Sequence, residues 1–207
     1  MNIIVDYGAG NLSSLQRAFE QIGLDVEISD DKEVIQNASS IILPGVGAFG
    51  AAMDELKKRN LIDVLKKKAM EGTPFLGICL GMQLLYEFSE EEGKYEGLGL
   101  LKGTIKRIPD TVKVPHMGWN SLTFYKNDPI LKNNLDGDYV YFVHSYYAQA
   151  DDENIVAYSD YGVKVPAIVN SKNIYGMQFH PEKSSEAGLN LLKTFKEMIS
   201  YETISSN

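Results

Sequence analysis

The sequence predicts an α/β fold built on a central, mostly parallel sheet with helices on both faces and an antiparallel or mixed extension. In the first half, short apolar runs alternate with amphipathic stretches whose apolar residues recur at helical spacing. Parallel strands require such crossover segments, and the crossover helices cover both faces of the sheet. In the second half, strand-like runs are separated by Gly, Asn and Asp turns, which favours antiparallel or mixed pairing. The length of 207 residues fits a single domain spanning 1–207.

The elements of the first half follow from apolar spacing and from the residues that end each run. The first helix is expected to begin after Asn11, whose side chain can cap it, and to end at Gly23. Its predicted buried stripe consists of Leu15, Ala18, Phe19 and Ile22. Four predicted strands cover 2–6, 26–29, 40–43 and 73–78, and three further helices cover 49–58, 61–70 and 82–88.

The second half is predicted to be rich in strands and to end in a helix. The predicted strands cover 104–108, 139–143, 155–158, 167–170 and 174–178. The last helix is expected at 184–200, and its predicted buried stripe is Leu189, Leu192, Phe195 and Ile199. The polar tail 202–207 is expected to fray, and the acidic run 90–92 is expected to form a solvated loop.

Composition excludes several classes of function. The net charge of −8 argues against nucleic acid or an anionic membrane as the main partner. A single cysteine excludes an internal disulfide and fits a reducing cytoplasm. The N-terminal residues lack the pattern of a signal peptide, and no apolar run approaches the ~20 residues that span a bilayer. The three histidines are far apart and form no metal-ligand pattern, so no metal and no cofactor are predicted.

That single cysteine lies in the pattern Gly-x-Cys-x-Gly, between a predicted strand and a predicted helix. This is the thiol version of the nucleophile elbow, in which a tight turn holds a nucleophile up into a site. Gly77 and Gly81 are expected because side chains there would collide with the neighbouring strand and helix. The helix N-terminus favours the thiolate of Cys79. The alternative for a lone cysteine is a small buried apolar residue.

His180 and Glu182 lie in the motif His-Pro-Glu, directly after the last predicted strand. In an extended segment, residues i and i+2 project to the same side, so Glu182 can reach one imidazole nitrogen while the other faces the sulfur of Cys79. A nucleophile, a base and an orienting carboxylate form the general triad arrangement. The alternatives are a structural histidine, and for Glu182 a helix N-terminal charge ahead of Ser184.

A glycine-rich loop at 43–50 joins a predicted strand to a predicted helix. Such a loop can turn its backbone N–H groups toward an oxyanion, here those of Val46 and Gly47. The N–H of Leu80, directly after the cysteine, is the natural further donor. The loop lacks the ending of a phosphate-binding P-loop and the spacing of a dinucleotide fingerprint.

Together, Gly-x-Cys-x-Gly-Met-Gln, Pro-Gly-Val-Gly and His-Pro-Glu resemble the signature of class I (triad) glutamine amidotransferases, which are flavodoxin-like α/β proteins. Segments spread over the whole chain are similar to the HisH-type glutaminase subunits of imidazole glycerol phosphate synthase. These segments are 6–12, 44–49, 77–83, 115–120, 141–146 and 178–184.

The resemblance implies that Cys79, His180 and Glu182 hydrolyse glutamine to glutamate and ammonia without a cofactor. The glutamine contacts that it implies are Gln83, Glu91, Ser145 and Tyr146. Hydrolysis by the isolated chain is expected to be weak, because the flexible loop at 44–47 can require a partner to set it.

The resemblance also implies a heterodimer with a HisF-type (β/α)8 cyclase subunit, which uses the ammonia to form imidazole glycerol phosphate and an aminoimidazole carboxamide nucleotide (AICAR) in histidine biosynthesis. Direct delivery is needed because water would protonate free ammonia. The residues implied at the interface are Asn11, Trp119, Tyr141 and Lys183. Core packing is the alternative for Trp119 and Tyr141. For His144 the alternative is a structural hydrogen bonder near the site, and His116 is expected to be structural.

Two other functions remain open at this stage. A paralogous amidotransferase would use the same chemistry to supply ammonia for sugar amidination in surface glycan synthesis. A non-catalytic binding module could use the same fold, although complete triad residues argue against it.

Overall fold

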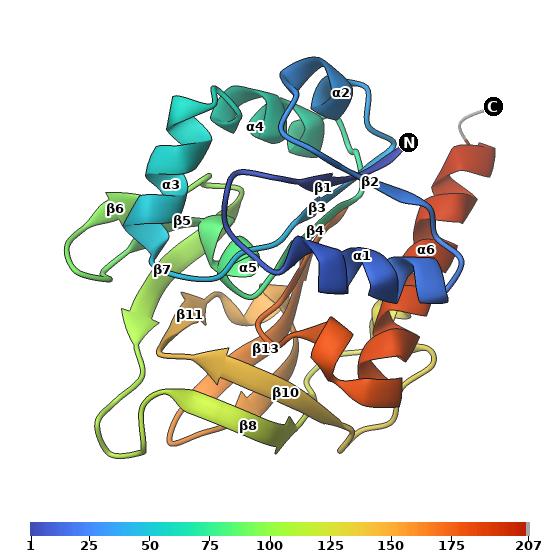
Figure 1. Cartoon of the computed structure of the whole chain (residues 1–207). Coiled ribbons are helices and arrows are strands. Elements are labelled where there is room, and N and C mark those ends of the chain that lie inside the picture. The colour runs from blue at the N-terminus through green and yellow to red at the C-terminus, as the bar shows by residue number, and fades with distance from the viewer. Residues whose placement is uncertain (206–207) are drawn as a thin grey trace.

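The computed structural model describes the backbone of residues 1–205 and the side chains of residues 1–200 (Figure 1). Its main sheet has eight strands in the order β2-β1-β3-β4-β14-β13-β12-β9. The first five strands pair in parallel and the last three add antiparallel pairs, which confirms the predicted parallel sheet and its extension. The strands are β1 (Asn2–Val5), β2 (Val26–Ser29), β3 (Ser40–Leu43), β4 (Phe75–Ile78), β9 (Thr123–Phe124), β12 (Ile155–Asp160), β13 (Lys164–Ser171) and β14 (Ile174–Met177).

Two smaller sheets, formed by strands between residues 86 and 150, lie beside the main one. Strands β8 (His116–Ser121) and β10 (Tyr139–His144) form an antiparallel pair, which we call the β8–β10 ribbon. The other sheet has the order β11-β7-β5-β6. Its strands are β5 (Tyr86–Ser89), β6 (Tyr95–Glu96), β7 (Leu101–Arg107) and β11 (Tyr146–Ala150). In Figure 1 the β8–β10 ribbon and β11 lie in the lower half of the molecule, and β5 and β6 lie beside α3.

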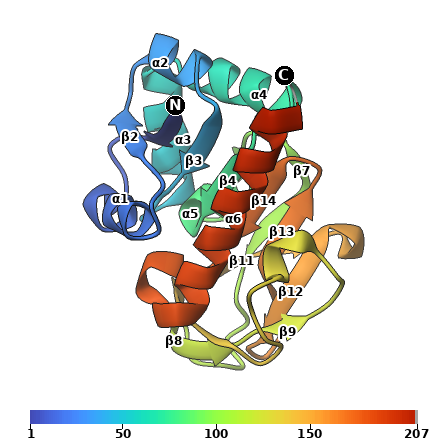
Figure 2. The ribbon, with the colours of Figure 1, turned by 90° about the vertical axis from the view of Figure 1, so that its right-hand side faces the viewer.

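Helices cover both faces of the main sheet (Figure 2). Helices α1 and α6 pack on one face, and α2, α3 and α4 pack on the other. The helices are α1 (Leu12–Gln21), α2 (Lys32–Gln36), α3 (Phe49–Lys58), α4 (Ile62–Met70), α5 (Leu80–Leu84) and α6 (Ser185–Ser205), with 3₁₀ turns η1 (Pro129–Leu131), η2 (Asp152–Asn154) and η3 (Pro181–Lys183). The predicted doubly covered sheet is therefore present.

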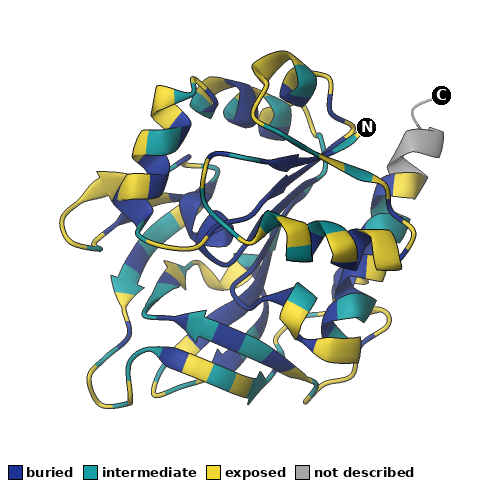
Figure 3. Ribbon diagram, in the orientation of Figure 1, coloured by how far each residue is buried: buried dark blue, intermediate teal, exposed yellow. Residues whose placement is uncertain are grey.

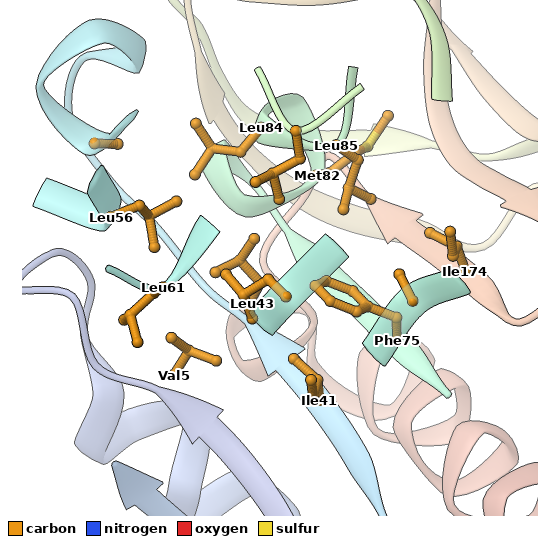
Figure 4. Packing of buried hydrophobic residues seen from close by; sticks show 14 of the residues in the cluster. Val5, Ile41, Leu43, Leu56, Leu61, Phe75, Met82, Leu84, Leu85 and Ile174 are labelled. Carbon is orange, nitrogen blue, oxygen red and sulfur yellow. The ribbon is translucent and has the colours of Figure 1, made fainter. Parts of the chain in front are cut away.

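The two apolar clusters follow from the alternation of side chains along each central strand. Val5 and Phe75 point into the cluster beneath α3 and α4 (Figure 4), whereas Ile4 and Leu76 point into the cluster beneath α1 and α6. Strands buried on both faces carry apolar residues at every position, which explains the continuous apolar runs in the sequence. Figure 3 shows the resulting buried centre and the exposed outer sides of the helices.

Local signals place the first helix as predicted. The Asn11 side chain accepts a hydrogen bond from the Ser14 N–H at 3.4 Å, and Gly23 adopts a φ of +73° after the helix ends. Helix α3 also has the predicted bounds. The predicted sequence ranges missed α2, β5, β6, β8, β9 and β11, which are short or carry polar residues.

A helix follows the elbow as predicted, but the predicted range 82–88 is wrong, because α5 covers Leu80–Leu84 and the chain continues into β5. The carbonyl oxygen of Leu84 accepts the Leu98 N–H, and that of Leu85 accepts the N–H groups of Leu100 and Leu101. The strand region therefore satisfies the last carbonyls of the helix, which would otherwise bond to a next helical turn.

The C-terminal helix is longer than predicted. Helix α6 continues to Ser205, so 202–205 is helical, while 206–207 lies outside the described residues. Leu192, Phe195 and Ile199 are buried as predicted, whereas Leu189 is only half-buried and Leu191 is fully buried in its place. In the part of the chain that the structure describes, we find no helix with the length and apolar character needed to cross a membrane.

Removing a central side chain tests the importance of this core. Phe75 on β4 is fully buried, so Phe75→Ala should lower the free energy of unfolding by about 3–5 kcal/mol. Denaturant unfolding at equilibrium measures the change. Met70 is 77% exposed, and Met70→Ala is the control, expected within about 0.5 kcal/mol of the parent. Equal losses in the two variants would contradict the assigned core.

Candidate active site

Cys79 occupies the turn between β4 and α5 in a strained backbone conformation. Its φ is +55° and its ψ is −114°, a region that residues other than glycine rarely adopt. The Cys79 N–H donates to the Met177 carbonyl oxygen of β14 at 2.7 Å, which fixes the turn to the sheet. The predicted elbow is therefore present, and its sulfur-bearing residue sits at the carboxyl end of a central strand.

The two flanking glycines permit this turn, as the sequence predicts. A Cβ atom on Gly81 would overlap the Leu43 carbonyl group at the end of β3. A Cβ atom on Gly77 would lie 2.8 Å from backbone atoms of Gly81 and Met82 in α5. These collisions would involve the neighbouring strand β3 and the helix α5, as the sequence predicts. Packing therefore requires glycine at both positions.

His180 reaches the same site from the far end of the sequence. Its backbone N–H donates to the Tyr141 carbonyl oxygen at 3.0 Å, and its Nδ1 lies 2.8 Å from Oε1 of Glu182. His180 and Cys79 line one cavity, while Nε2 of His180 has no hydrogen-bond partner in the described residues. The contact between His180 and Glu182 is as predicted, but its origin is not. Residues Pro181–Lys183 form a 3₁₀ turn, so the predicted extended segment is wrong beyond His180.

The surroundings of His180 favour its charged form. Burial lowers the pKa of the imidazole, but the neighbouring Cys79 sulfur and the Glu182 carboxylate outweigh burial and raise the pKa to about 9. The Cys79 sulfur itself lies 4.0 Å from the Val143 carbonyl oxygen and 4.0 Å from Nε2 of Gln178. The arrangement can therefore supply a sulfur nucleophile, a charged imidazole and a carboxylate that holds it.

The glycine-rich loop after β3 reaches the site, but its own backbone already accepts a hydrogen bond from one of the expected oxyanion donors. The Leu80 N–H donates to the Gly45 carbonyl oxygen at 3.3 Å. The Tyr7 hydroxyl donates to the Pro44 carbonyl oxygen at 2.7 Å and fixes the start of the loop. Burial, and to a lesser extent Cys79, raise the pKa of Tyr7, so its hydroxyl stays a neutral donor. Val46 and Gly47 line the cavity and are exposed.

The cavity has a volume of about 380 Å³, of the size that holds a small polar ligand. It gathers most of the residues that the sequence assigns to the site. Those along its wall are Val46, Gly47, Cys79, Leu80, Gln83, Glu91, Ser145, Tyr146 and His180, and the structure adds Pro115, Val143 and His144.

Two polar side chains in this region differ from the sequence-based picture. Glu91 is half-buried and accepts the Phe49 N–H at 2.8 Å, so the acidic run predicted as a solvated loop is partly packed at this residue. Burial raises the pKa of Glu91, the Phe49 N–H opposes the rise, and Glu92 adds to it. Gln178, which sequence reasoning missed, is fully buried and accepts from Nε2 of Gln83 at 2.9 Å. Its position in the sequence gives no sign of this contact, because Gln83 lies 95 residues away.

The residues expected at an interface lie outside the cavity. Trp119 and Tyr141 are cross-strand partners in the β8–β10 ribbon, with ring centroids 6.0 Å apart. Trp119 is 51% exposed, so the core-packing alternative is wrong for this residue, and Tyr141 is half-buried. Asn11 and Lys183 are exposed on α1 and η3, and η3 packs against both β10 and α1.

No group of three or more potential metal ligands occurs among the described residues.

Comparison with known proteins places the chain in a family. The family model described as glutamine amidotransferase class-I matches residues 3–198. The chain belongs to the class I glutamine amidotransferase family. Among the solved structures that resemble it is a crystal structure of a glutamine amidotransferase with a TM-score of 0.77 and 18% sequence identity, covering 96% of this chain and 98% of the other. At that identity the likeness supports the amidotransferase fold alone.

Curated relatives place this amidotransferase within a narrower group. The imidazole glycerol phosphate synthase subunit HisH of Oceanobacillus iheyensis is 53% identical over 200 residues, which cover 96% of this chain and 100% of the relative. The subunit of the same name from Lactococcus lactis is 52% identical over 198 residues, which cover 95% and 98% of the two chains. The chain is therefore a HisH-type class I glutamine amidotransferase.

The ion pair between His180 and Glu182 should make stability depend on pH. A folded-state pKa of about 9, above the ordinary 6.5, means that this contribution is complete below pH 6.5 and is lost as the pH rises through 9. Glu182→Gln should therefore lower the free energy of unfolding more at about pH 6 than at about pH 10, as measured by denaturant unfolding. Glu186→Gln, which alters an exposed acid at the start of α6, is the control and should lack this difference. An equal loss for Glu182→Gln at both pH values would remove the assigned ion pair.

Proposed function

We propose that this chain is the glutaminase subunit of an imidazole glycerol phosphate synthase and that it acts in histidine biosynthesis in the cytoplasm. Two observations together support the proposal. Cys79, His180 and Glu182 are arranged as a triad, and the curated relatives described above, which are about half identical to this chain, are both named HisH. The substrate is glutamine, and the products are glutamate and ammonia.

The proposed reaction passes through a thioester. The thiolate of Cys79 attacks the side-chain amide carbon of glutamine, and the imidazolium of His180 gives a proton to the departing ammonia as the C–N bond breaks. Neutral His180 then takes a proton from water, whose oxygen attacks the thioester and releases glutamate and the thiolate. Glu182 holds the ring and stabilises its charge through the 2.8 Å contact.

The oxyanion donors are assigned to the N–H groups of Val46 or Gly47 and of Leu80. The Leu80 N–H is occupied by the Gly45 carbonyl oxygen at 3.3 Å, so the peptide at Gly45 has to rotate before Leu80 can serve. On the far side of this peptide, Val46 is exposed and Gly47 carries no side chain, so neither residue anchors the peptide in the core. We assign the trigger for rotation to the docking of the synthase partner.

The partner is a HisF-type (β/α)8 cyclase, which receives ammonia directly and forms imidazole glycerol phosphate and AICAR. Its docking surface is the outer face of the β8–β10 ribbon, where Met117, Trp119 and Tyr139 are all more than half exposed. Apolar residues gathered on one strand pair mark a contact surface, and Trp and Tyr are the residue types that contribute most at such contacts. Asn11 and Lys183 are assigned to its polar margin.

The alternatives make different predictions. An amidotransferase for surface glycans would not support the cyclase reaction, and the HisH name of the relatives favours the histidine pathway. A binding module would not react with a glutamine-analogue electrophile, whereas the proposed enzyme is labelled covalently at Cys79.

Replacing the nucleophile separates glutamine hydrolysis from ammonia use. In the complex with the cyclase, Cys79→Ala should abolish synthesis of imidazole glycerol phosphate from glutamine and leave synthesis from added ammonium salt within about twofold of the parent. Product formation with each nitrogen source measures both rates. Loss of both rates in a complex that still assembles would contradict the role of ammonia supplier.

Partner docking should activate hydrolysis. Glutamate release by the isolated chain is expected to be slow, and it should rise by about 100-fold or more when the cyclase and its nucleotide ligand are added, because freeing an oxyanion donor is worth that much. The Cys79→Ala chain under the same conditions gives the background. Equal rates with and without the cyclase would remove the proposed rotation at Gly45.

The ribbon surface can be tested by truncating its largest side chain. Trp119→Ala should weaken binding to the cyclase by about tenfold or more, since it removes a central aromatic anchor. Titration calorimetry measures the dissociation constant. Met70→Ala removes another exposed apolar side chain, at the opposite end of the sheet from the cavity, and should bind as the parent does. An unchanged affinity of the Trp119→Ala chain would place the interface elsewhere.

A further inference from the structure

A chain of hydrogen bonds runs from the ribbon to the wall of the cavity. Nδ2 of Asn120 lies 3.2 Å from Nε2 of His116, and Nδ1 of His116 lies 3.0 Å from Nε2 of His144. Nδ1 of His144 lies 2.7 Å from the Tyr146 carbonyl oxygen. The reaction proposed above uses neither histidine, although both are buried and His144 lines the cavity.

The partners fix the direction of every bond in this chain. The Tyr146 carbonyl oxygen can only accept, so Nδ1 of His144 carries a proton and its Nε2 accepts. His116 must then donate from Nδ1, which leaves its Nε2 to accept from Asn120. The Asn120 amide agrees, because its oxygen accepts the Ser121 N–H at 2.8 Å and its nitrogen also donates to the Asp160 carbonyl oxygen at 3.0 Å. Both histidines are therefore neutral and carry the proton on Nδ1.

Packing keeps the two rings neutral and in place. His116 is stacked between Phe142 and Tyr161, with ring centroids 4.4 Å and 3.9 Å away. Burial lowers the pKa of His116 to about 4. Burial also lowers the pKa of His144 to about 3, helped by His116 and His180 and opposed by the bond to Tyr146.

The Tyr146 carbonyl oxygen is where this chain meets the glutamine site. It accepts from Nδ1 of His144 at 2.7 Å and from Nε2 of Gln83 at 2.9 Å. The same Gln83 nitrogen donates its second proton to Oε1 of Gln178 at 2.9 Å. Both amide protons of Gln83 are thereby engaged, so its oxygen is the atom that remains to accept a hydrogen bond from a ligand in the cavity.

We propose that His116 and His144 are positioning residues for glutamine, which hold the Tyr146 carbonyl group and, through it, the amide of Gln83. The proposal rests on the proposed glutaminase function. If His116 cannot donate, the His144 proton is free to move to Nε2, and a lone pair on Nδ1 then faces the carbonyl oxygen. That oxygen loses one of its two donors, and the orientation of Gln83 is no longer fixed.

The first experiment reads the protonation of the rings without using activity. The chain has three histidines, so a full-length sample labelled with ¹⁵N-histidine gives a simple imidazole spectrum. Near neutral pH we expect one charged ring, that of His180, and two neutral rings protonated on Nδ1, those of His116 and His144. A proton on Nε2 of either neutral ring, or a charge on either, would overturn the proposal.

The second experiment uses kinetics of the complex with the cyclase. His116→Phe keeps an aromatic ring in the stack but removes the donor, and should raise KM for glutamine about five- to tenfold while kcat changes by less than about twofold. His116→Asn can place an amide donor near the position of Nδ1 and should restore KM to within about twofold of the parent.

Controls separate the positioning role from general damage. Tyr161→Phe preserves the stack on His116 and removes only a hydroxyl that donates to the Lys113 carbonyl oxygen, so its KM should equal that of the parent. Synthesis from ammonium salt should be unchanged in all three variants. If the parent complex releases no glutamate, the proposed function fails and the imidazole spectrum alone decides the state of the histidine pair. If the parent is active and His116→Phe leaves KM unchanged, the positioning role is overturned.

Discussion

The rest of the site depends on one close approach, that of the Gly81 backbone to the Leu43 carbonyl group. It allows α5 to begin directly against the end of β3, and so allows Cys79 to hold its positive φ at the tip of β4. The strand order then assembles the remaining parts. The neighbours of β4 are β3, which continues into the glycine-rich loop, and β14, which leads to His180. A crevice at the carboxyl ends of parallel strands is where such folds bind ligands.

The histidines show how one residue type is used in two electrostatic states within a single site. His180 has a carboxylate and a sulfur beside it, and its pKa is raised to about 9. His144 is equally buried but meets a carbonyl oxygen and another neutral ring, and its pKa falls to about 3. Environment therefore separates the ring that is proposed to move protons in the reaction from the ring that is proposed to keep one in place.

Sequence reasoning could place the parallel sheet, most central elements and the cysteine turn, because each has a local signal: apolar runs, helical spacing, a cap at Asn11 and glycines at fixed offsets. It could not predict features that depend on hydrogen bonds between residues far apart in the sequence. Helix α5 ends early because residues 98–101 take its last carbonyls, and the Leu80 N–H is occupied through the path of the loop at Gly45. The contact of Gln178 with Gln83 joins positions 95 residues apart, and no pattern in the sequence announces it.

The alternation of side chains in the β8–β10 ribbon limits which insertions, deletions and substitutions the ribbon can tolerate. Met117, Trp119 and Tyr139 occupy the outer side, while the two buried histidines occupy the inner side of the same strands. Inserting or deleting one residue would exchange the two sets, turning imidazoles to solvent and the indole into the core. A substitution in the ribbon changes one side chain, whereas an insertion or a deletion changes the side that every following side chain of that strand faces. The lengths of β8 and β10 are therefore more tightly constrained than their individual residues.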